Sequence, residues 1–82
     1  MVKVIVSEKY EKSVLKIKDA SIKERLIKLM YKIKENPEIG KPIRYNRKGT
    51  REVYFGSFRM SYAYEKQTET IYLLEFYHKD EQ

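Results

Sequence analysis

A glycine and a serine, Gly56 and Ser57, separate two runs of residues in which apolar and polar side chains alternate. The pair fits the two-residue type II′ turn, whose first position needs a positive φ and therefore favours glycine. Such a turn fixes how the flanking strands, about 51–55 and 58–65, pair with each other. The sequence therefore predicts a tight β-hairpin with a defined register, and this hairpin constrains the rest of the fold.

The hairpin register assigns every side chain to one of two faces, because successive residues of a strand point to opposite sides. One face is apolar and aromatic, and we expect helices to cover it: Val53, Phe55, Phe58, Met60, Tyr62 and Tyr64. The other face carries Glu52, Tyr54, Arg59, Ser61 and Ala63. Tyr54 lies opposite Arg59, and Glu52 lies diagonal to it, so a carboxylate, a phenol and a guanidinium share one open surface. Arg59 either serves an anionic ligand there or pairs with Glu52 across the hairpin.

Two helices are predicted before the hairpin. Ser7 is expected to cap the first helix, in which apolar residues recur at helical spacing to about Lys18. Ser21 and Glu24 form a capping box that is expected to begin the second helix, and Asn36, which precedes a proline, is expected to end it. The short break between the two helices predicts an antiparallel helical hairpin.

Two further strands are predicted, at residues 2–6 and at about 70–77. The last strand is expected to point three side chains into the core: Tyr72, Leu74 and Phe76. Its open face is expected to hold Glu75, Tyr77 and Lys79, with His78 toward the core unless the strand bulges. The order β-α-α-β-β-β predicts one α+β domain over residues 1–82, an antiparallel sheet packed against a helical hairpin.

Positive charge is concentrated in a short segment. The chain carries a formal net charge of +6, and residues 41–56 hold five Lys/Arg against one Glu, a net of +4. The five cations are Lys41, Arg44, Arg47, Lys48 and Arg51. Such an asymmetry predicts an anionic partner, either nucleic acid or an acidic protein segment.

Other functional classes are disfavoured by composition. The chain has no cysteine and one histidine, so no disulfide, thiolate site or multi-histidine metal cluster is expected. It has neither a long apolar run nor a signal-peptide pattern, which predicts a soluble, cytoplasmic protein.

A G-x-[FY]-R-x-x-Y pattern runs from Gly56 to Tyr62, and a second apolar strand leads into a His-Lys ending between Leu73 and Lys79. Two N-terminal helices and a K-P-[LI] loop complete a pattern that spans the whole chain. In order, length and spacing, the chain resembles the RelE/ParE superfamily of toxins from type II toxin–antitoxin systems. Within that superfamily it looks most like the small RelE-type toxins.

The resemblance implies a small RelE-like fold and a microbial toxin that enters the ribosomal A site and cleaves mRNA. It also implies a RelB-like antitoxin that wraps around the toxin in a hetero-oligomer. Two alternatives to this function remain open. One is a ParE-like toxin that inhibits DNA gyrase without nuclease activity. The other is a catalytically inactive module that binds an antitoxin or RNA.

The implied reaction is attack on the phosphate by the RNA's own 2′-hydroxyl, without a metal or cofactor. The resemblance gives Arg59 contact with the scissile phosphate, where a cation stabilises added charge. Lys79 is the nearest match to a basic residue near the end of the last strand, and it assists together with Arg51. Glu52 is the candidate base, and the cations of residues 41–51 are expected to contact RNA.

The candidate acid is either His78 or Tyr54. RelE-type toxins usually carry Lys or Arg at the two outward positions of the first hairpin strand, where this chain has Glu52 and Tyr54. Relatives that resemble YoeB use a glutamate, an arginine and a C-terminal histidine instead. Glu52, Arg59 and His78 supply those residue types, although the glutamate stands at a different place.

Overall fold

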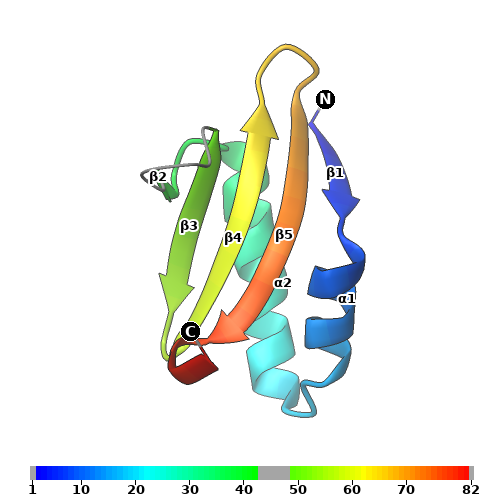
Figure 1. Ribbon diagram of the computed structural model, residues 1–82, viewed down its shortest axis with the longest axis vertical. Coiled ribbons are helices and arrows are strands. Elements are labelled where there is room, and N and C mark those ends of the chain that lie inside the picture. The colour runs from blue at the N-terminus through cyan, green and yellow to red at the C-terminus, as the bar shows by residue number, and fades with distance from the viewer. Residues whose placement is uncertain (1, 43–48, 82) are drawn as a thin grey trace.

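Two helices pack on one face of a five-stranded sheet in the computed structural model, which describes residues 2–42 and 49–81 (Figure 1). The helices are α1 (Glu8–Leu15) and α2 (Ala20–Glu35). The strands are β1 (Lys3–Val6), β2 (Lys41–Pro42), β3 (Thr50–Phe55), β4 (Phe58–Glu65) and β5 (Thr70–His78), followed by a 3₁₀ turn, η1 (Lys79–Glu81). The predicted α+β class and the predicted hairpin of helices are confirmed.

The sheet has the order β1-β5-β4-β3-β2, and it is mixed rather than wholly antiparallel. β1 runs parallel to β5, whereas the other neighbouring strands are antiparallel. The prediction of an antiparallel sheet was wrong for this one edge, because local sequence patterns do not specify the direction in which distant strands pair. The two-residue strand β2 was also not predicted, since residues 37–50 carry only turn signals.

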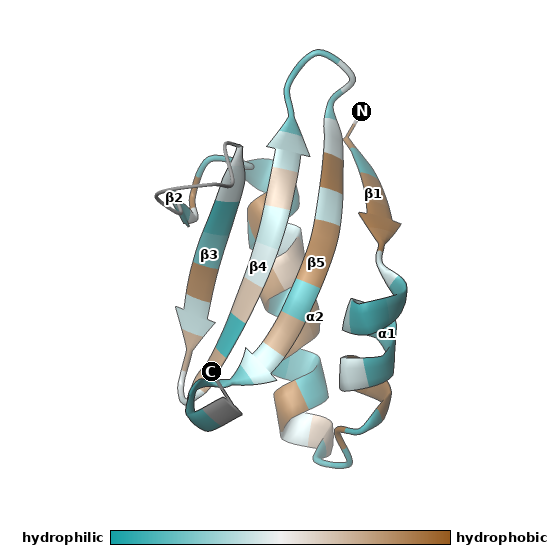
Figure 2. Ribbon diagram, viewed as in Figure 1, coloured by the Kyte–Doolittle hydropathy of each residue, from teal (hydrophilic) through white to brown (hydrophobic). Residues whose placement is uncertain are grey.

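The hairpin of β3 and β4 has the predicted register. Phe55 pairs with Phe58 and Tyr54 pairs with Arg59. Gly56 has φ of +56°, as the first position of a type II′ turn requires. Figure 2 shows the resulting alternation of hydrophilic and hydrophobic residues along the strands. The local turn chemistry and the alternation therefore suffice to define the central part of this fold.

Two helix boundaries differ from the prediction. α1 ends at Leu15 rather than near Lys18, because the backbone N–H of Lys16 bonds to two carbonyls of the preceding turn and tightens it. α2 begins at Ala20, because the Asp19 carboxylate accepts hydrogen bonds from the backbone N–H and the hydroxyl of Ser21, both at 2.8 Å. These bonds lower the pKa of Asp19, and the bond from the Ser21 hydroxyl has the larger effect. The predicted capping box at Ser21 is replaced by this aspartate cap.

A β-bulge changes the phase of β5. Ser61 pairs with Glu75 but the next residue, Tyr62, pairs with Leu73, so Leu74 is an extra residue between them. The predicted core positions Tyr72 and Leu74 were therefore wrong. The buried apolar residues of β5 are Ile71, Leu73 and Phe76, of which only Phe76 was predicted.

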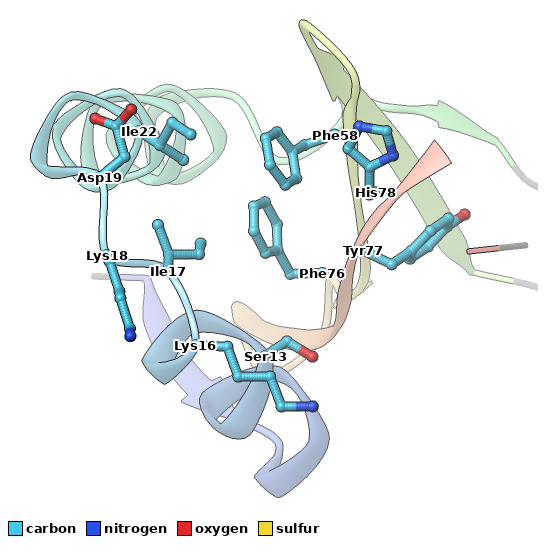
Figure 3. Close-up of a pocket in the computed structure, with 10 residues that line it drawn as sticks. All are labelled: Ser13, Lys16, Ile17, Lys18, Asp19, Ile22, Phe58, Phe76, Tyr77 and His78. Atoms are coloured by element: carbon cyan, nitrogen blue, oxygen red, sulfur yellow. The ribbon is translucent and has the colours of Figure 1, made fainter. Parts of the chain in front are cut away.

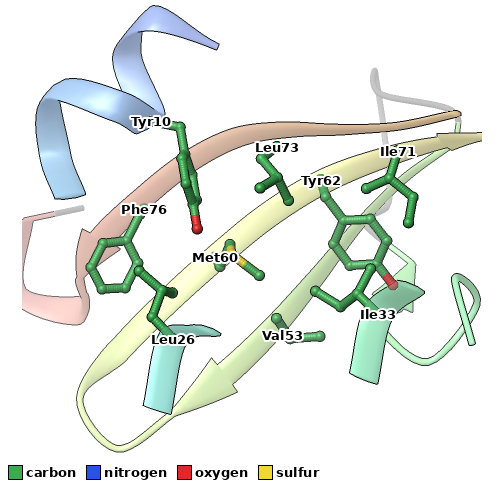
Figure 4. Close-up of a cluster of buried hydrophobic side chains, with 9 residues drawn as sticks. All are labelled: Tyr10, Leu26, Ile33, Val53, Met60, Tyr62, Ile71, Leu73 and Phe76. Carbon is green, nitrogen blue, oxygen red and sulfur yellow. The ribbon is translucent and has the colours of Figure 1, made fainter. Parts of the chain in front are cut away.

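The core lies between the sheet and the two helices (Figure 4). Its buried side chains are Tyr10, Leu26, Ile33, Val53, Met60, Tyr62, Ile71, Leu73 and Phe76. Burial raises the pKa of the Tyr10 phenol to about 12. Within the described residues, neither helix has the length and apolarity that crossing a membrane would require.

Candidate functional site

The open face of the hairpin brings together three of the predicted catalytic residues. Tyr54 and Arg59 are direct cross-strand partners, and Glu52 pairs with Ser61 one step along the same face. The guanidinium carbon of Arg59 lies 4.9 Å from the centroid of the Tyr54 ring. This contact holds the cation over an aromatic ring at the surface, where it stays accessible to an anion.

Glu52 is engaged by a residue whose role the sequence did not reveal. The hydroxyl of Tyr77 donates a 2.7 Å hydrogen bond to Glu52 Oε2. Because Tyr77 lies on β5 and Glu52 on β3, this bond crosses the intervening strand β4. Among the side chains that the structure describes, no carboxylate lies within ion-pair distance of Arg59. The alternative in which Arg59 pairs with Glu52 is wrong, because no such ion pair forms between these two described side chains.

The phenol of Tyr54 is a proton donor at neutral pH. Its hydrogen bond to Glu52 raises its pKa above the ordinary value of 10.0. The side chain is 52% exposed, so a ligand can reach it. A protonated phenol beside a carboxylate and a guanidinium provides an acid, a base and an anion-stabilising group on one surface.

Ser61 was predicted to line the open face, but it is only 3% exposed. Its neighbours in the sheet register are Glu52 and Glu75. The Ser61 hydroxyl has no hydrogen-bond partner in the described structure. The Tyr77–Glu52 bond crosses the strand that holds this serine.

His78 lies on the helix-covered side of the sheet, as alternation predicted. Its ring meets the Phe58 ring edge-on at 5.3 Å, and its Nδ1 accepts a hydrogen bond from the backbone N–H of Asp80 at 3.2 Å. Figure 3 shows His78 beside Phe58, with Phe76 pointing toward the helices and Tyr77 pointing away. The sheet therefore separates this imidazole from Arg59.

The pocket beside His78 has a volume of about 310 Å³ and lies between β5 and the connection from α1 to α2. Ile17, Ile22 and Phe76 give it apolar walls, and Lys16 and Lys18 add cations. Within the described residues, no three His, Cys, Asp or Glu side chains gather as metal ligands would.

The remaining predicted residues lie at the two ends of the hairpin. Lys79 begins η1, is exposed, and donates its backbone N–H to the carbonyl of Ser57 at 2.8 Å. At the other end, Lys41 is exposed and pairs with Glu52, so it faces the open side of the sheet. The predicted RNA contacts Arg44, Arg47 and Lys48 lie outside the described residues.

Arg51 binds the loop that follows α2, a contact that the sequence did not indicate. Its Nη1 donates to the carbonyls of Glu38 at 3.0 Å and Gly40 at 2.8 Å. The buried Tyr62 binds the same loop, since its hydroxyl donates to the Pro37 carbonyl at 2.8 Å and accepts from the Gly40 N–H at 2.9 Å. A Cβ at Gly40 would lie 2.7 Å from that hydroxyl, so only glycine fits. These contacts fix the start of the cationic segment against the sheet.

Comparison with known proteins identifies relatives over nearly the whole chain. A family model described as the ParE toxin of the type II toxin–antitoxin system parDE matches residues 4–82. No curated protein matches the chain.

Solved structures share the fold. The isolated RelE toxin of E. coli superposes with a TM-score of 0.81 at 14% identity, covering 95% of this chain and 84% of that one. A chain of the RelBE2 toxin–antitoxin complex from Mycobacterium tuberculosis gives 0.82 at 20% identity, covering 94% and 96%. A chain of the intact E. coli RelBE complex gives 0.79 at 15% identity, covering 93% and 94%.

Proposed function

Because the chain belongs to the RelE/ParE family of type II toxin–antitoxin toxins, we propose that it is an endoribonuclease that cleaves mRNA on the ribosome. The observation that carries this proposal is that the Arg59 guanidinium lies over the Tyr54 ring at the surface. The neighbouring carboxylate of Glu52 accepts a hydrogen bond from Tyr77 instead of pairing with this arginine. The cation is thereby left for a phosphate.

In the proposed reaction, Glu52 accepts the proton of the RNA 2′-hydroxyl, and the oxygen attacks the adjacent phosphorus. Arg59 stabilises the charge that develops on the phosphate oxygens. The new bond joins the 2′-oxygen to phosphorus, and the bond to the 5′-oxygen breaks. Tyr54 donates its proton to that leaving oxygen. The products are a 2′,3′-cyclic phosphate and a 5′-hydroxyl, and DNA is not cleaved because it lacks the 2′-hydroxyl.

The position of His78 supports the choice of Tyr54 as the acid. His78 packs edge-on against Phe58 on the far side of the sheet, whereas the Tyr54 ring contacts Arg59 directly. A general acid must come within hydrogen-bond reach of the leaving oxygen, so the acid has to share a face with the arginine.

The proposed protein partner is a RelB-like antitoxin that covers the toxin in a hetero-oligomer. Two of the similar structures are toxin–antitoxin complexes, one from M. tuberculosis and one from E. coli. The net charge of +6 favours an acidic partner.

The test is cleavage of mRNA in a translating extract, with the new 5′ ends mapped. Wild-type protein is expected to produce cuts positioned by the codon, and Arg59→Ala is expected to lower their rate at least about 100-fold, the effect of losing one donor to a developing oxyanion. Lys66→Ala removes an equal charge from an exposed side chain in the β4–β5 turn and should preserve cleavage. Intact mRNA with the wild-type protein would contradict the proposal.

The second candidate is a ParE-like toxin that poisons DNA gyrase and cleaves nothing. The family model that matches residues 4–82 is described as a ParE toxin, which favours this candidate. Glu52 and Tyr54 also stand where nucleases of the RelE type usually carry cations. Inhibition of gyrase supercoiling together with intact mRNA would support it.

A further inference from the structure

A cationic groove lies between α2 and β3, beside the open face of the hairpin. Its volume is about 280 Å³. The lining residues are Arg25, Lys28, Leu29, Lys32, Tyr54 and Phe55. The three cations recur at helical spacing, so they project from one flank of α2 toward β3.

Two of the three cations are not neutralised by an acidic neighbour. Lys28 forms an exposed ion pair with Glu24 at 3.6 Å. Arg25 instead lies over the Phe55 ring, with its guanidinium carbon 5.5 Å from the centroid. Across the described ranges, neither Arg25 nor Lys32 has a carboxylate within ion-pair distance, and both are exposed. The groove therefore attracts anions.

Tyr54 joins this groove to the open face. It lines the groove, and on the hairpin it lies directly opposite Arg59. The short strand β2 pairs only with Arg51 and Glu52, so residues 53–55 form a sheet edge within the described part of the chain. A polymer bound at Arg59 can thus pass over Tyr54 and around this narrow edge into the groove.

The geometry points to a second RNA subsite, in which the groove holds phosphates of the same single strand that Arg59 contacts. The inference rests on the proposed function and extends its binding surface. Cations beside an exposed aromatic ring, here that of Tyr54, suit single-stranded nucleic acid, because a base can stack on the ring while phosphates meet the cations. An acidic peptide would satisfy the cations but would leave the Tyr54 ring without a stacking partner.

The experiment measures binding of a fluorescent 2′-O-methyl RNA oligonucleotide, which cannot undergo 2′-hydroxyl attack, over a range of salt concentrations. Arg25→Gln with Lys32→Gln removes two phosphate contacts. Each phosphate contact to a single strand contributes roughly 0.7 to the slope of log affinity against log salt. Losing two contacts should therefore make this slope shallower by about 1.4. The matched control is Lys23→Gln with Lys34→Gln, which removes the same charge from the opposite flank of α2. Arg25→Lys with Lys32→Arg should restore the wild-type slope.

Each outcome separates this inference from the nuclease proposal. A shallower slope in the groove variant but not in the control supports the subsite, even in a protein that fails to cleave mRNA. A groove variant with the slope of the control overturns the subsite and leaves the nuclease proposal standing. Absence of RNA binding by the wild type also overturns it. If the variant loses affinity for poly-L-glutamate but not for RNA, the groove binds acidic protein and the subsite is refuted.

Discussion

Removing a single hydroxyl, by Tyr62→Phe, is expected to release the loop that leads into the cationic segment. Tyr62 is fully buried, and Figure 4 shows its ring beside Ile33 of α2. Its hydroxyl donates to the Pro37 carbonyl and accepts from the Gly40 N–H. Phenylalanine keeps the ring and its apolar contacts, so the change isolates these two hydrogen bonds.

The magnitude follows from the burial of the partners. Gly40 is buried, so its N–H cannot turn to water once the hydroxyl is gone, whereas Pro37 is only half-buried. Leaving one buried donor unsatisfied costs roughly 1–3 kcal/mol, and we expect a loss of about 2 kcal/mol in the free energy of unfolding. For a domain of this size, that loss lowers Tm by about 8–16 °C. Burial also raises the pKa of Tyr62, which keeps the donor intact at neutral pH.

The assay is urea unfolding followed by circular dichroism, with the free energy obtained by linear extrapolation. Tyr31→Phe is the matched control, because that tyrosine is 58% exposed and loses a solvated hydroxyl. Its stability should change by less than about 0.5 kcal/mol. Equal stabilities of Tyr62→Phe and Tyr31→Phe would refute the argument that the hydroxyl holds the loop.

Two further predictions concern the site and the core. Tyr77→Phe removes one of the two phenol hydrogen bonds to the Glu52 carboxylate and lets that oxygen turn toward Arg59. The slope of log affinity for RNA against log salt should then become shallower by about 0.7, and adding Glu52→Gln should restore it. An unchanged slope in Tyr77→Phe would show that the bond does not keep Glu52 away from the arginine. Because the pKa of Tyr10 is raised from 10.0 to about 12, folding favours its protonated form. This contribution to the free energy of unfolding is fully present below pH 10 and is lost as the pH rises toward 12. At 1.36 kcal/mol per pKa unit, the loss amounts to about 2–3 kcal/mol. Urea midpoints measured from pH 9 to 12 should therefore decline more steeply for the wild type than for Tyr10→Phe, and parallel declines would contradict the assignment.

The sequence predicted the hairpin well because everything that defines it is local. The Gly56-Ser57 turn and the alternation on either side determine both register and faces. The grouping of Glu52, Tyr54 and Arg59 follows from that register alone, and the structure confirms their placement.

The local sequence does not determine which side chains of β5 face the core. Both alternating sets of this strand are largely apolar, and the set with Tyr72 and Leu74 was preferred because strict alternation would otherwise bury Glu75 with Ile71 and Leu73. The bulge at Leu74 changes the phase within one strand, and bulges leave no reliable mark in a short apolar run. The contact between Tyr77 and Glu52 depends on how three strands align, and so it was not predicted.

The separation of His78 from Arg59 limits the chemistry that this sheet can support. A β-sheet with a packed core on one side keeps the two faces apart, so side chains pointing in opposite directions cannot act on one phosphate. His78 has its ring against Phe58, and the open face has Tyr54 beside Arg59. The residue types that resemble the YoeB arrangement are present in the chain, but the alternation of β5 places its histidine on the wrong side. In the proposed reaction the acid is therefore Tyr54, whose pKa is raised by its hydrogen bond to Glu52 and whose ring lies on the same face as Arg59.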